Sequence, residues 1–467
     1  MISLLLLSLA CTDPTGNPDD SSGPGPTPVA DLEATAALED DIATVAWVTW
    51  STETAGTSWV EYGPDERLGY STVRSTATTT EHAVLLAGLP AASTWYWRAV
   101  SEVDGEQRVS VVTEITTGVA PRDLPRASVT SDDPSLAHTG YTVTTSLGDP
   151  AWVIIYAADG SPVWWTPAPE QSVIAQVRLT DDGTAVLYNV ANLNFSVDVG
   201  YIRRVRLDGE VLSETRTVLG HHDFVVLPEG GFGYIAADMR EWTDPDSGAT
   251  YTVVGDAIVE VPEGATDDTP RTEIYNTWDH FAVDVDPVKD RDFYPQGLDW
   301  THSNSLGFAD GEYLLSVRKE NSVVKVDRAT GEELWQLGGV NSAFTLTDGR
   351  AFVGQHSPEL TEAGFMLFDN GDVSIRDAYS EAVEYTLDED GRTFTRLWSY
   401  DYGQRISSYL LGDVERLANG NTLVAWGSGG TITEVTPDGQ MALQVSMPIG
   451  SAIGFTHHLD ALGGVPQ

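Results

Sequence analysis

Apolar and polar residues alternate along much of this chain in short runs that turn residues separate. In the first part of the chain such runs occupy 42–50, 57–63, 82–89, 94–103 and 110–117. Alternation of this kind is typical of half-buried β-strands, and about seven short strands over ninety residues suit a β-sandwich. We therefore predict a small β-sandwich at 28–118, followed by a linker at 119–140.

Beyond residue 140 the pattern changes to two kinds of β-hairpin that alternate. One kind has two apolar strands around a glycine-containing turn, and the other ends in a tryptophan or an apolar strand. Pairing the two kinds gives five units of four strands, at 174–214, 222–276, 302–337, 356–399 and 413–447. Four-stranded sheets repeated around an axis form a β-propeller.

A sixth unit is expected where the ring closes. The hairpin YAADGSPVWW lacks a first half, which a C-terminal strand near 453–460 would supply. We therefore predict an all-β chain in which a six-bladed β-propeller at 141–467 follows the sandwich. Five or seven blades stay open, because the second and fourth units contain long insertions. A β-helix would need a shorter and stricter period, and paired sandwiches would not explain two alternating hairpin types.

Three histidines occupy nearly the same position in three of these units. His222, His302 and His356 each stand eight or nine residues before the turn glycine of the first hairpin. In a propeller this position is the start of an innermost strand, so the three side chains would meet at one mouth of the central channel. A lone histidine at a strand start is usually a satisfied loop residue, but three in register indicate a site.

Other polar residues are expected at the same mouth. Arg318 falls at the end of a second strand, Asn304 follows His302 by two residues, and Asn370 ends another second strand. Asp299, three residues before His302, can orient its imidazole or cap a loop. A guanidinium with several imidazoles suits a tetrahedral oxyanion group, because the guanidinium binds its oxygens while imidazoles attack or transfer protons.

Composition limits the partners of the chain. Its 70 acidic and 25 basic residues give a formal net charge of −45, which nucleic-acid phosphates would repel. Apolar residues make up 41% of the chain and aromatic residues 9%, as in a chain with packed cores. The acidic pairs lack EF-hand spacing, and we expect neither a cofactor nor a bound metal ion.

The N-terminus predicts export. Residues 1–10 form a short apolar run that ends in Ala10, before Cys11, and a polar tether rich in Pro and Gly follows at 12–27. Residues 1–11 resemble a bacterial lipoprotein signal, in which the cysteine is lipidated after cleavage, although Lys and Arg are absent from its first residues. An ordinary secretory signal is the alternative. We expect a periplasmic or cell-surface protein whose contact with the membrane is a lipid anchor.

Two parts of the chain resemble known families. The stretch LAGLPAASTWYWRAV resembles the fibronectin type III pattern, which implies a spacer or docking domain at 28–118. The ordered series HHDFVVLPEGGF, WTHSNS, VRKEN, QHSPELTEAGF, FDNG and NGNTLVAWG resembles the bacterial arylsulfotransferase family over about 141–447. That family is a six-bladed propeller and does not use the nucleotide donor PAPS.

The second resemblance implies roles for the candidate residues. His356 matches a transiently sulfated histidine, His302 a histidine of proton transfer or sulfuryl binding, Arg318 the sulfuryl-binding arginine, and His222 the remaining catalytic histidine. Further residues are expected to bind substrate: His221, Asn304 and Asn370. The implied reaction is ping-pong: an aryl sulfate gives its sulfuryl group to His356, a phenol leaves, and a second phenol accepts the group.

Two other functions stay open on the sequence alone. A non-catalytic propeller would hold an anion or a glycan at the same mouth, and three histidines can also bind a divalent metal ion in a lyase or hydrolase. Arg318 argues against the metal, because a cation beside a metal ion costs electrostatic energy. Histidines outside the register are expected to be structural, namely His82, His138 and His280, and the pair His457 and His458 is expected on the closing strand.

Overall fold

The computed structural model describes residues 29–467, with gaps at 132, 149, 171, 181, 192–197, 199, 288, 291–293, 295, 373, 376–377, 404, 463–464 and 467. Cys11 and the tether at 12–27 lie outside the described residues. The regular structure is β, apart from 3-10 turns at Pro134–Leu136, Thr277–Asp279 and Gly427–Gly429. Within the part of the chain that is described, no helix is both long and apolar enough to cross a membrane.

An N-terminal region of eight strands precedes the propeller. Its long central strand β3 (Ala46–Gly63) pairs through its first half with β2 (Ala34–Leu38) and β5 (Thr79–Leu86), and through its second half with β6 (Thr94–Val103). Alternate side chains of these strands fill an apolar core around Trp97, as the sequence pattern predicts. The remaining strands are β1 (Val29–Leu32), β4 (Tyr70–Ser71), β7 (Glu106–Ser110) and β8 (Thr113–Thr116).

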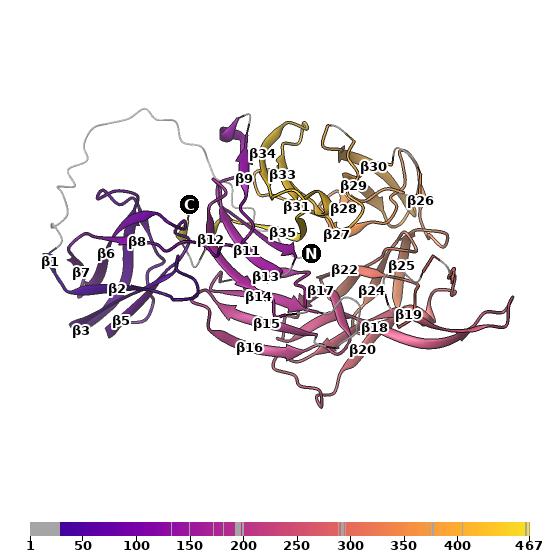
Figure 1. Ribbon diagram of the computed structural model, residues 1–467, viewed down its shortest axis with the longest axis horizontal. Coiled ribbons are helices and arrows are strands. Elements are labelled where there is room, and N and C mark those ends of the chain that lie inside the picture. The colour runs from indigo at the N-terminus through magenta and orange to yellow at the C-terminus, as the bar shows by residue number, and fades with distance from the viewer. Residues whose placement is uncertain are drawn as a thin grey trace, which may run out of the picture.

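Six sheets of four or more strands surround a central channel, which confirms the six-bladed propeller (Figure 1). Five blades use four successive strands that run antiparallel to their neighbours. These blades are β13–β16 (Val177–Leu179, Ala185–Val190, Tyr201–Arg206, Val211–Arg216), β17–β20 (Gly220–Val226, Phe232–Thr243, Thr250–Val261, Thr272–Asn276), β22–β25 (Ser303–Ala309, Glu312–Val317, Ser322–Asp327, Glu333–Gly338), β27–β30 (His356–Leu360, Gly364–Asp369, Glu381–Asp388, Thr393–Tyr400) and β31–β34 (Asp413–Arg416, Thr422–Trp426, Thr431–Val435, Met441–Ser446).

Three short strands extend these sheets. They are β9 (Ser128–Thr130) beside β34, β21 (Leu298–Asp299) beside β19 and β26 (Thr345–Leu346) beside β30. The first of them lies within 119–140, so part of the segment expected to be a linker forms the outer edge of a blade.

The sixth blade is assembled from both ends of the propeller. β10 (Tyr141–Leu147), β11 (Trp152–Ala157) and β12 (Pro162–Pro167) come from its beginning, and β35 (Ala452–Leu459) comes from its end. β35 runs antiparallel to β10 and takes the innermost place, as expected of a closing strand, and it carries His457 and His458. The short hairpin β36 (Ala461–Leu462) and β37 (Val465–Pro466) follows. In Figure 1 the yellow and purple sheets meet where the ring closes.

Hydrogen bonds join the inner strands of successive blades around the channel. Each contact links one blade to the next: Gln176 to Asp223, Asp223 to Leu306, Ser305 to Ser357, Ser357 to Gly412 and Asp413 to Thr456. These buried contacts fix the inner strands relative to one another. They therefore also fix the side chains at the strand starts.

Large apolar side chains pack between neighbouring blades. Trp164 of β12 is fully buried in a cluster that includes Val186 and Tyr188 of the next blade, and its Nε1 donates to the Leu207 carbonyl at 2.8 Å. Trp335 of β25 is likewise buried among aromatic residues of the following blade. Packing between blades is therefore the role of these tryptophans.

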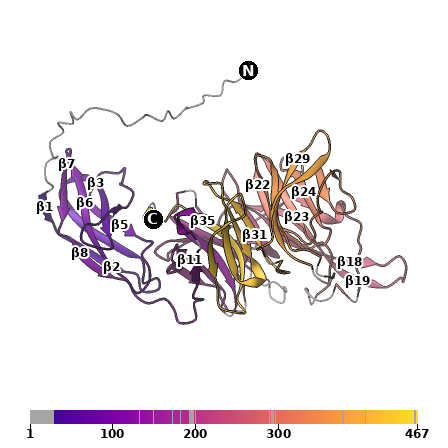
Figure 2. The same ribbon diagram turned by 90° about the horizontal axis from the view of Figure 1, so that it is seen from above.

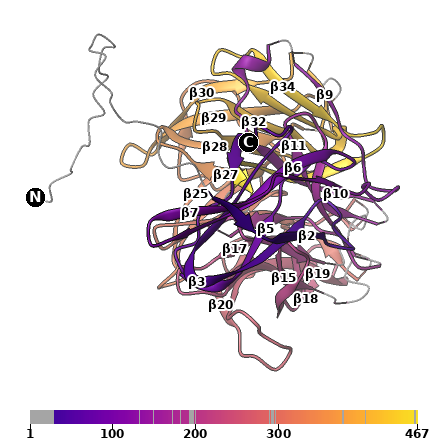
Figure 3. The ribbon, with the colours of Figure 1, turned by 90° about the vertical axis from the view of Figure 1, so that its left-hand side faces the viewer.

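The N-terminal region lies beside the sixth blade, as Figures 2 and 3 show. Thr44 Oγ1 donates to the Val163 carbonyl at 2.7 Å, and Trp165 Nε1 donates to the Asp41 carbonyl at 3.1 Å. Ile42 completes the contact by joining the apolar cluster of that blade. These contacts reach β12, the outer strand, and leave the inner strands of the channel untouched.

We expect Trp164→Ala to lower the free energy of unfolding by about 3–5 kcal/mol, because the change leaves a cavity between two blades and an unpaired carbonyl. Val340→Ala, at a fully exposed apolar residue, is the matched control and should stay within about 0.5 kcal/mol of the wild type. Urea denaturation followed by tryptophan fluorescence measures both. Equal midpoints for the two variants would contradict the packing role.

Candidate functional site

Three inner strands bring the predicted histidines to the same end of the channel. His222 is the third residue of β17, His302 directly precedes β22, and His356 begins β27. The register of each strand against its neighbour shifts at this point, and such bulges re-aim side chains. His222, His302 and Ser357 have φ of 52°, 50° and 49°, a region that non-glycine residues enter at a cost. The strand starts are therefore held in strained conformations by their surroundings.

Asn370 fixes which nitrogen of His356 carries the proton. Its amide group donates to the carbonyl oxygens of Ser408 at 2.6 Å and Leu411 at 2.7 Å, so its Oδ1 faces His356 Nδ1 at 2.6 Å. Because that oxygen can only accept, His356 donates from Nδ1 and keeps its lone pair on Nε2. Asn370 directly follows β28, which brings it level with the start of β27.

Asp299 orients His302 in the same way, which is one of the two roles that its position left open, the other being a loop cap. Its Oδ2 lies 2.8 Å from His302 Nδ1 and 3.3 Å from the Nζ of Lys319. Burial opposes ionisation of Asp299, but the charges of His302 and Lys319 lower the pKa of its carboxyl overall. A carboxylate at Nδ1 holds a proton there, so Nε2 is the nitrogen of His302 that can exchange a proton with a bound molecule.

His222 is oriented by a chain of two further buried residues. Asp256 Oδ1 lies 3.2 Å from His221 Nε2, and His221 Nδ1 lies 2.7 Å from His222 Nδ1. The nearby carboxylate favours the tautomer of His221 that has its proton on Nε2, in which Nδ1 accepts a hydrogen bond from His222 Nδ1. The other oxygen of Asp256 accepts hydrogen bonds from the Thr301 hydroxyl at 2.5 Å and the Ser303 amide at 2.6 Å. These two residues flank His302.

Burial keeps two of these imidazoles neutral. Desolvation is the main cause that lowers the pKa of His222 well below 6.5. Smaller contributions in the same direction come from the neighbouring His221, His302, His356 and Arg318. Desolvation, followed by Arg318, lowers the pKa of His356 to about 3. The ring centroids of His222 and His302 lie 5.0 Å apart. The groups are thus close enough to act on one bound molecule.

Arg318 supplies positive charge at this end of the channel. It directly follows β23, its backbone amide donates to the His302 carbonyl at 3.4 Å, and its Nη2 donates to the Tyr409 carbonyl at 3.3 Å. Burial lowers its pKa, but a guanidinium stays charged at ordinary pH. Its Nε is buried without a hydrogen-bond partner, and no described carboxylate lies within 4.0 Å of it. A guanidinium in this state suits an anionic ligand.

Asn304 and Gln355 connect the third blade to the strand start that carries His356. Asn304 is fully buried, and its Nδ2 donates to the Gln355 carbonyl at 2.8 Å. Gln355 Nε2 donates to Ser316 Oγ at 3.1 Å, near the end of the strand that leads into Arg318. The amide of Asn304, expected to bind substrate, is therefore directed at backbone in this structure.

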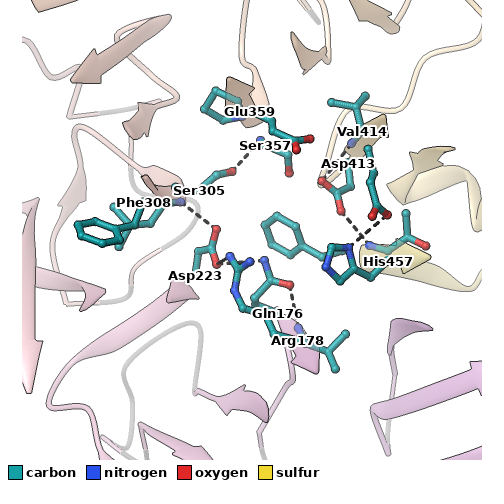
Figure 4. A pocket seen from close by; sticks show the side chains of 17 residues that line it. Gln176, Arg178, Asp223, Ser305, Phe308, Ser357, Glu359, Asp413, Val414 and His457 are labelled. Atoms are coloured by element: carbon teal, nitrogen blue, oxygen red, sulfur yellow. Dashed lines mark hydrogen bonds and ion pairs between the residues drawn. The ribbon is translucent and has the colours of Figure 1, made fainter. Parts of the chain in front are cut away.

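Farther along the inner strands the channel contains a cavity of about 260 Å³ (Figure 4). Its wall includes four carboxyl groups, those of Asp223, Glu359, Asp413 and Glu415, together with Arg178 and His457. His457 Nδ1 lies 3.2 Å from Glu415. This part of the channel is rich in carboxyl groups. At the histidine end, by contrast, the guanidinium of Arg318 has no carboxylate partner among the described residues. An anion is therefore favoured at the histidine end.

The histidine end has the parts that group transfer to and from an anion requires. Arg318 can bind the oxygens of a tetrahedral anion, and the Nε2 of His356 is an unprotonated nucleophile. His302, backed by a carboxylate, can take up and release a proton. His222 can accept a hydrogen bond through its own Nε2.

Three contributors to this geometry were not predicted: Asp256, Gln355 and Lys319. Asp256 lies inside β19 in an ordinary apolar strand pattern, and only its contacts with residues 45 and 47 positions later show what it does. Gln355 directly precedes a candidate histidine, and that adjacency is a signal that could have found it. His221, expected to bind substrate, has a fully buried side chain and stands behind His222.

Comparison with known proteins identifies one family. A sequence model of the Arylsulfotransferase (ASST) family matches residues 127–448. The crystal structure of a protein of unknown function from Bacteroides caccae is 14% identical in sequence, with a TM-score of 0.44, over 68% of this chain and 98% of that one. Catalytically inactive virginiamycin B lyase from Staphylococcus aureus with quinupristin is 11% identical, with a TM-score of 0.37, over 71% and 99%. Structural similarity this low carries no functional argument, and no curated protein matches the chain.

The low pKa of His356 predicts a pH-dependent stability. Below pH 6.5 the unfolded chain binds a proton at this imidazole while the folded chain does not, so falling pH favours unfolding. At pH 5 this difference amounts to about 2 kcal/mol. His356→Asn removes it, so the variant should lose that much less stability than the wild type between pH 7 and pH 5. Urea denaturation at both pH values measures this, and identical losses would contradict the low pKa.

Proposed function

Because the chain belongs to the arylsulfotransferase (ASST) family, we propose that it moves a sulfuryl group from an aryl sulfate ester to a phenol through a sulfated histidine. The observation that carries the proposal is the guanidinium of Arg318, which has no carboxylate partner among the described residues and stands beside an unprotonated His356. Family membership supports the reaction class, and the local geometry supports the division of roles.

The first half-reaction transfers the sulfuryl group to His356. The Nε2 lone pair attacks the sulfur of the aryl sulfate, an N–S bond forms, and the bond from sulfur to the phenolic oxygen breaks with its electrons on that oxygen. Arg318 binds the sulfuryl oxygens and stabilises their charge. Nδ1 stays hydrogen-bonded to the amide oxygen of Asn370, which stabilises the positive charge of the sulfated ring.

Proton transfer falls to His302. His302 enters the first half-reaction with a proton on Nε2, which the departing phenolic oxygen takes. The acceptor phenol later returns a proton to Nε2 as its oxygen attacks the sulfur and the N–S bond breaks. Asp299 stabilises the protonated imidazole through the 2.8 Å contact at Nδ1. His222 stays neutral because of its lowered pKa, and its Nε2 accepts a hydrogen bond from the phenolic hydroxyl. Neither half-reaction requires a nucleotide donor.

His356→Asn should reduce sulfuryl transfer by about a thousandfold or more. Asparagine offers an amide donor near the place of Nδ1, so its contact with Asn370 can persist, but it has no nitrogen in the place of Nε2. The measurement is p-nitrophenol release from p-nitrophenyl sulfate, with and without added phenol, on the chain that follows Cys11. Wild-type release should rise with phenol.

Mass spectrometry after exposure to donor alone supplies the companion test. The wild type should gain the mass of one sulfuryl group, and His356→Asn should not. If well-folded wild type transfers sulfate from no aryl sulfate, the proposal fails in favour of a propeller that binds an anion or a glycan without turnover. If a chelator abolishes activity while the fold persists, a metal-dependent lyase or hydrolase is favoured instead.

His221 should act as a positioning residue for His222. His221→Phe removes the acceptor at His222 Nδ1 and should lower kcat about 10- to 100-fold with little change in KM. His221→Gln restores an oxygen acceptor and should recover most of the rate. Steady-state kinetics with the same donor and phenol measure both variants. Equal losses in the two variants, or a loss in KM alone, would contradict this role.

A further inference from the structure

Three potential metal ligands converge outside the channel, where the propeller closes. His138 precedes β10, His458 belongs to β35, and Asp460 follows β35. One nitrogen from each imidazole and one carboxylate oxygen lie within 4.8 Å of one another. Asp460 Oδ1 is 3.5 Å from His138 Nδ1 and 3.4 Å from His458 Nε2, and the ring centroids are 4.4 Å apart.

The two imidazoles are mostly enclosed, and one nitrogen is unsatisfied. The side chains of His138 and His458 are 16% and 10% exposed, whereas Asp460 is 74% exposed. His458 Nε2 is buried and has no hydrogen-bond partner among the described residues. A buried nitrogen that makes no hydrogen bond costs free energy, so a ligand bound to this atom would stabilise the protein. The exposed carboxylate beside it leaves a path from solvent.

The surroundings also suit a cation. His138 Nδ1 lies 2.9 Å from the Thr139 carbonyl, a contact that holds a proton on Nδ1 and leaves the lone pair on Nε2. The buried carboxylate of Glu434 accepts from the His138 amide at 2.8 Å and adds negative charge.

We propose that His138, His458 and Asp460 bind one divalent metal ion of the class that imidazole prefers, with Zn²⁺ as the best fit. Ligand atoms about 2.1 Å from a tetrahedral Zn²⁺ lie roughly 3.4 Å apart, which matches the 3.4 Å between Asp460 Oδ1 and His458 Nε2. The ion would connect the segment before β10 to the end of β35. It would thus stabilise the closed ring, independently of the transfer reaction in the channel.

Calorimetric titration of ZnCl₂ into chelator-treated protein tests the site. The wild type should bind one ion tightly, and His458→Ala should weaken that binding by about tenfold or more. Asp460→Asn provides a second variant, since its exposed side chain can change without disturbing the core, and it should weaken binding as well. His302→Ala is the matched control, because the channel histidines are the other place where Zn²⁺ could bind, and it should retain the tight site.

Thermal unfolding gives a second readout. Saturating Zn²⁺ should raise the Tm of the wild type and of His302→Ala by about 3 °C or more, and should have little effect on His458→Ala and Asp460→Asn. Tight binding that is lost in His302→Ala but kept in His458→Ala would overturn the proposal and place the ion in the channel. Absence of both stoichiometric binding and a Tm shift would overturn it outright.

Discussion

The pairing of β35 with β10 is the constraint on which the rest of the structure depends. The candidate site is made of residues from several blades, and their strand starts share one channel mouth only in a closed ring. The hydrogen bonds between inner strands transmit that closure around the axis, from Gln176 to Thr456. The N-terminal region and the cluster of His138, His458 and Asp460 both contact the sixth blade. The N-terminal region contacts the outer strand β12 of that blade, and the cluster lies where β35 meets the segment before β10.

Within the closed ring, the site has to solve an electrostatic problem. Protonated histidines beside Arg318 would repel one another strongly in a buried setting. The structure avoids this by burying His222 and His356 as neutral rings, and it directs all three Nδ1 atoms at different acceptors: an imidazole, a carboxylate and an amide oxygen. His302 is the one whose acceptor is charged. The carboxylate thus orients one ring for proton transfer, and nucleophilic character is kept at another.

Much of this arrangement could be predicted from sequence, because it follows from local periodicity. The alternation of hairpin types gives the six blades, and the spacing from turn glycines gives the strand starts of His222, His302 and His356. The orientation of the rings could not be predicted in full. It depends on contacts such as that of Asp256 with Thr301, 45 residues away, that no local pattern reveals. The pairing of β10 and the proximity of His138 to His458, 320 residues later, could not be predicted for the same reason. Both depend on how the ring closes.

The charge of the whole chain and the charge of the site act at different ranges. A net charge of −45 repels an aryl sulfate at long range, but at physiological ionic strength that repulsion is screened beyond about 8 Å. At contact distance the local groups decide. Asp299 is already engaged by His302 and Lys319, so the guanidinium of Arg318 is left to bind the anion. Under the proposed function, the acidic surface therefore slows encounter more than it weakens binding.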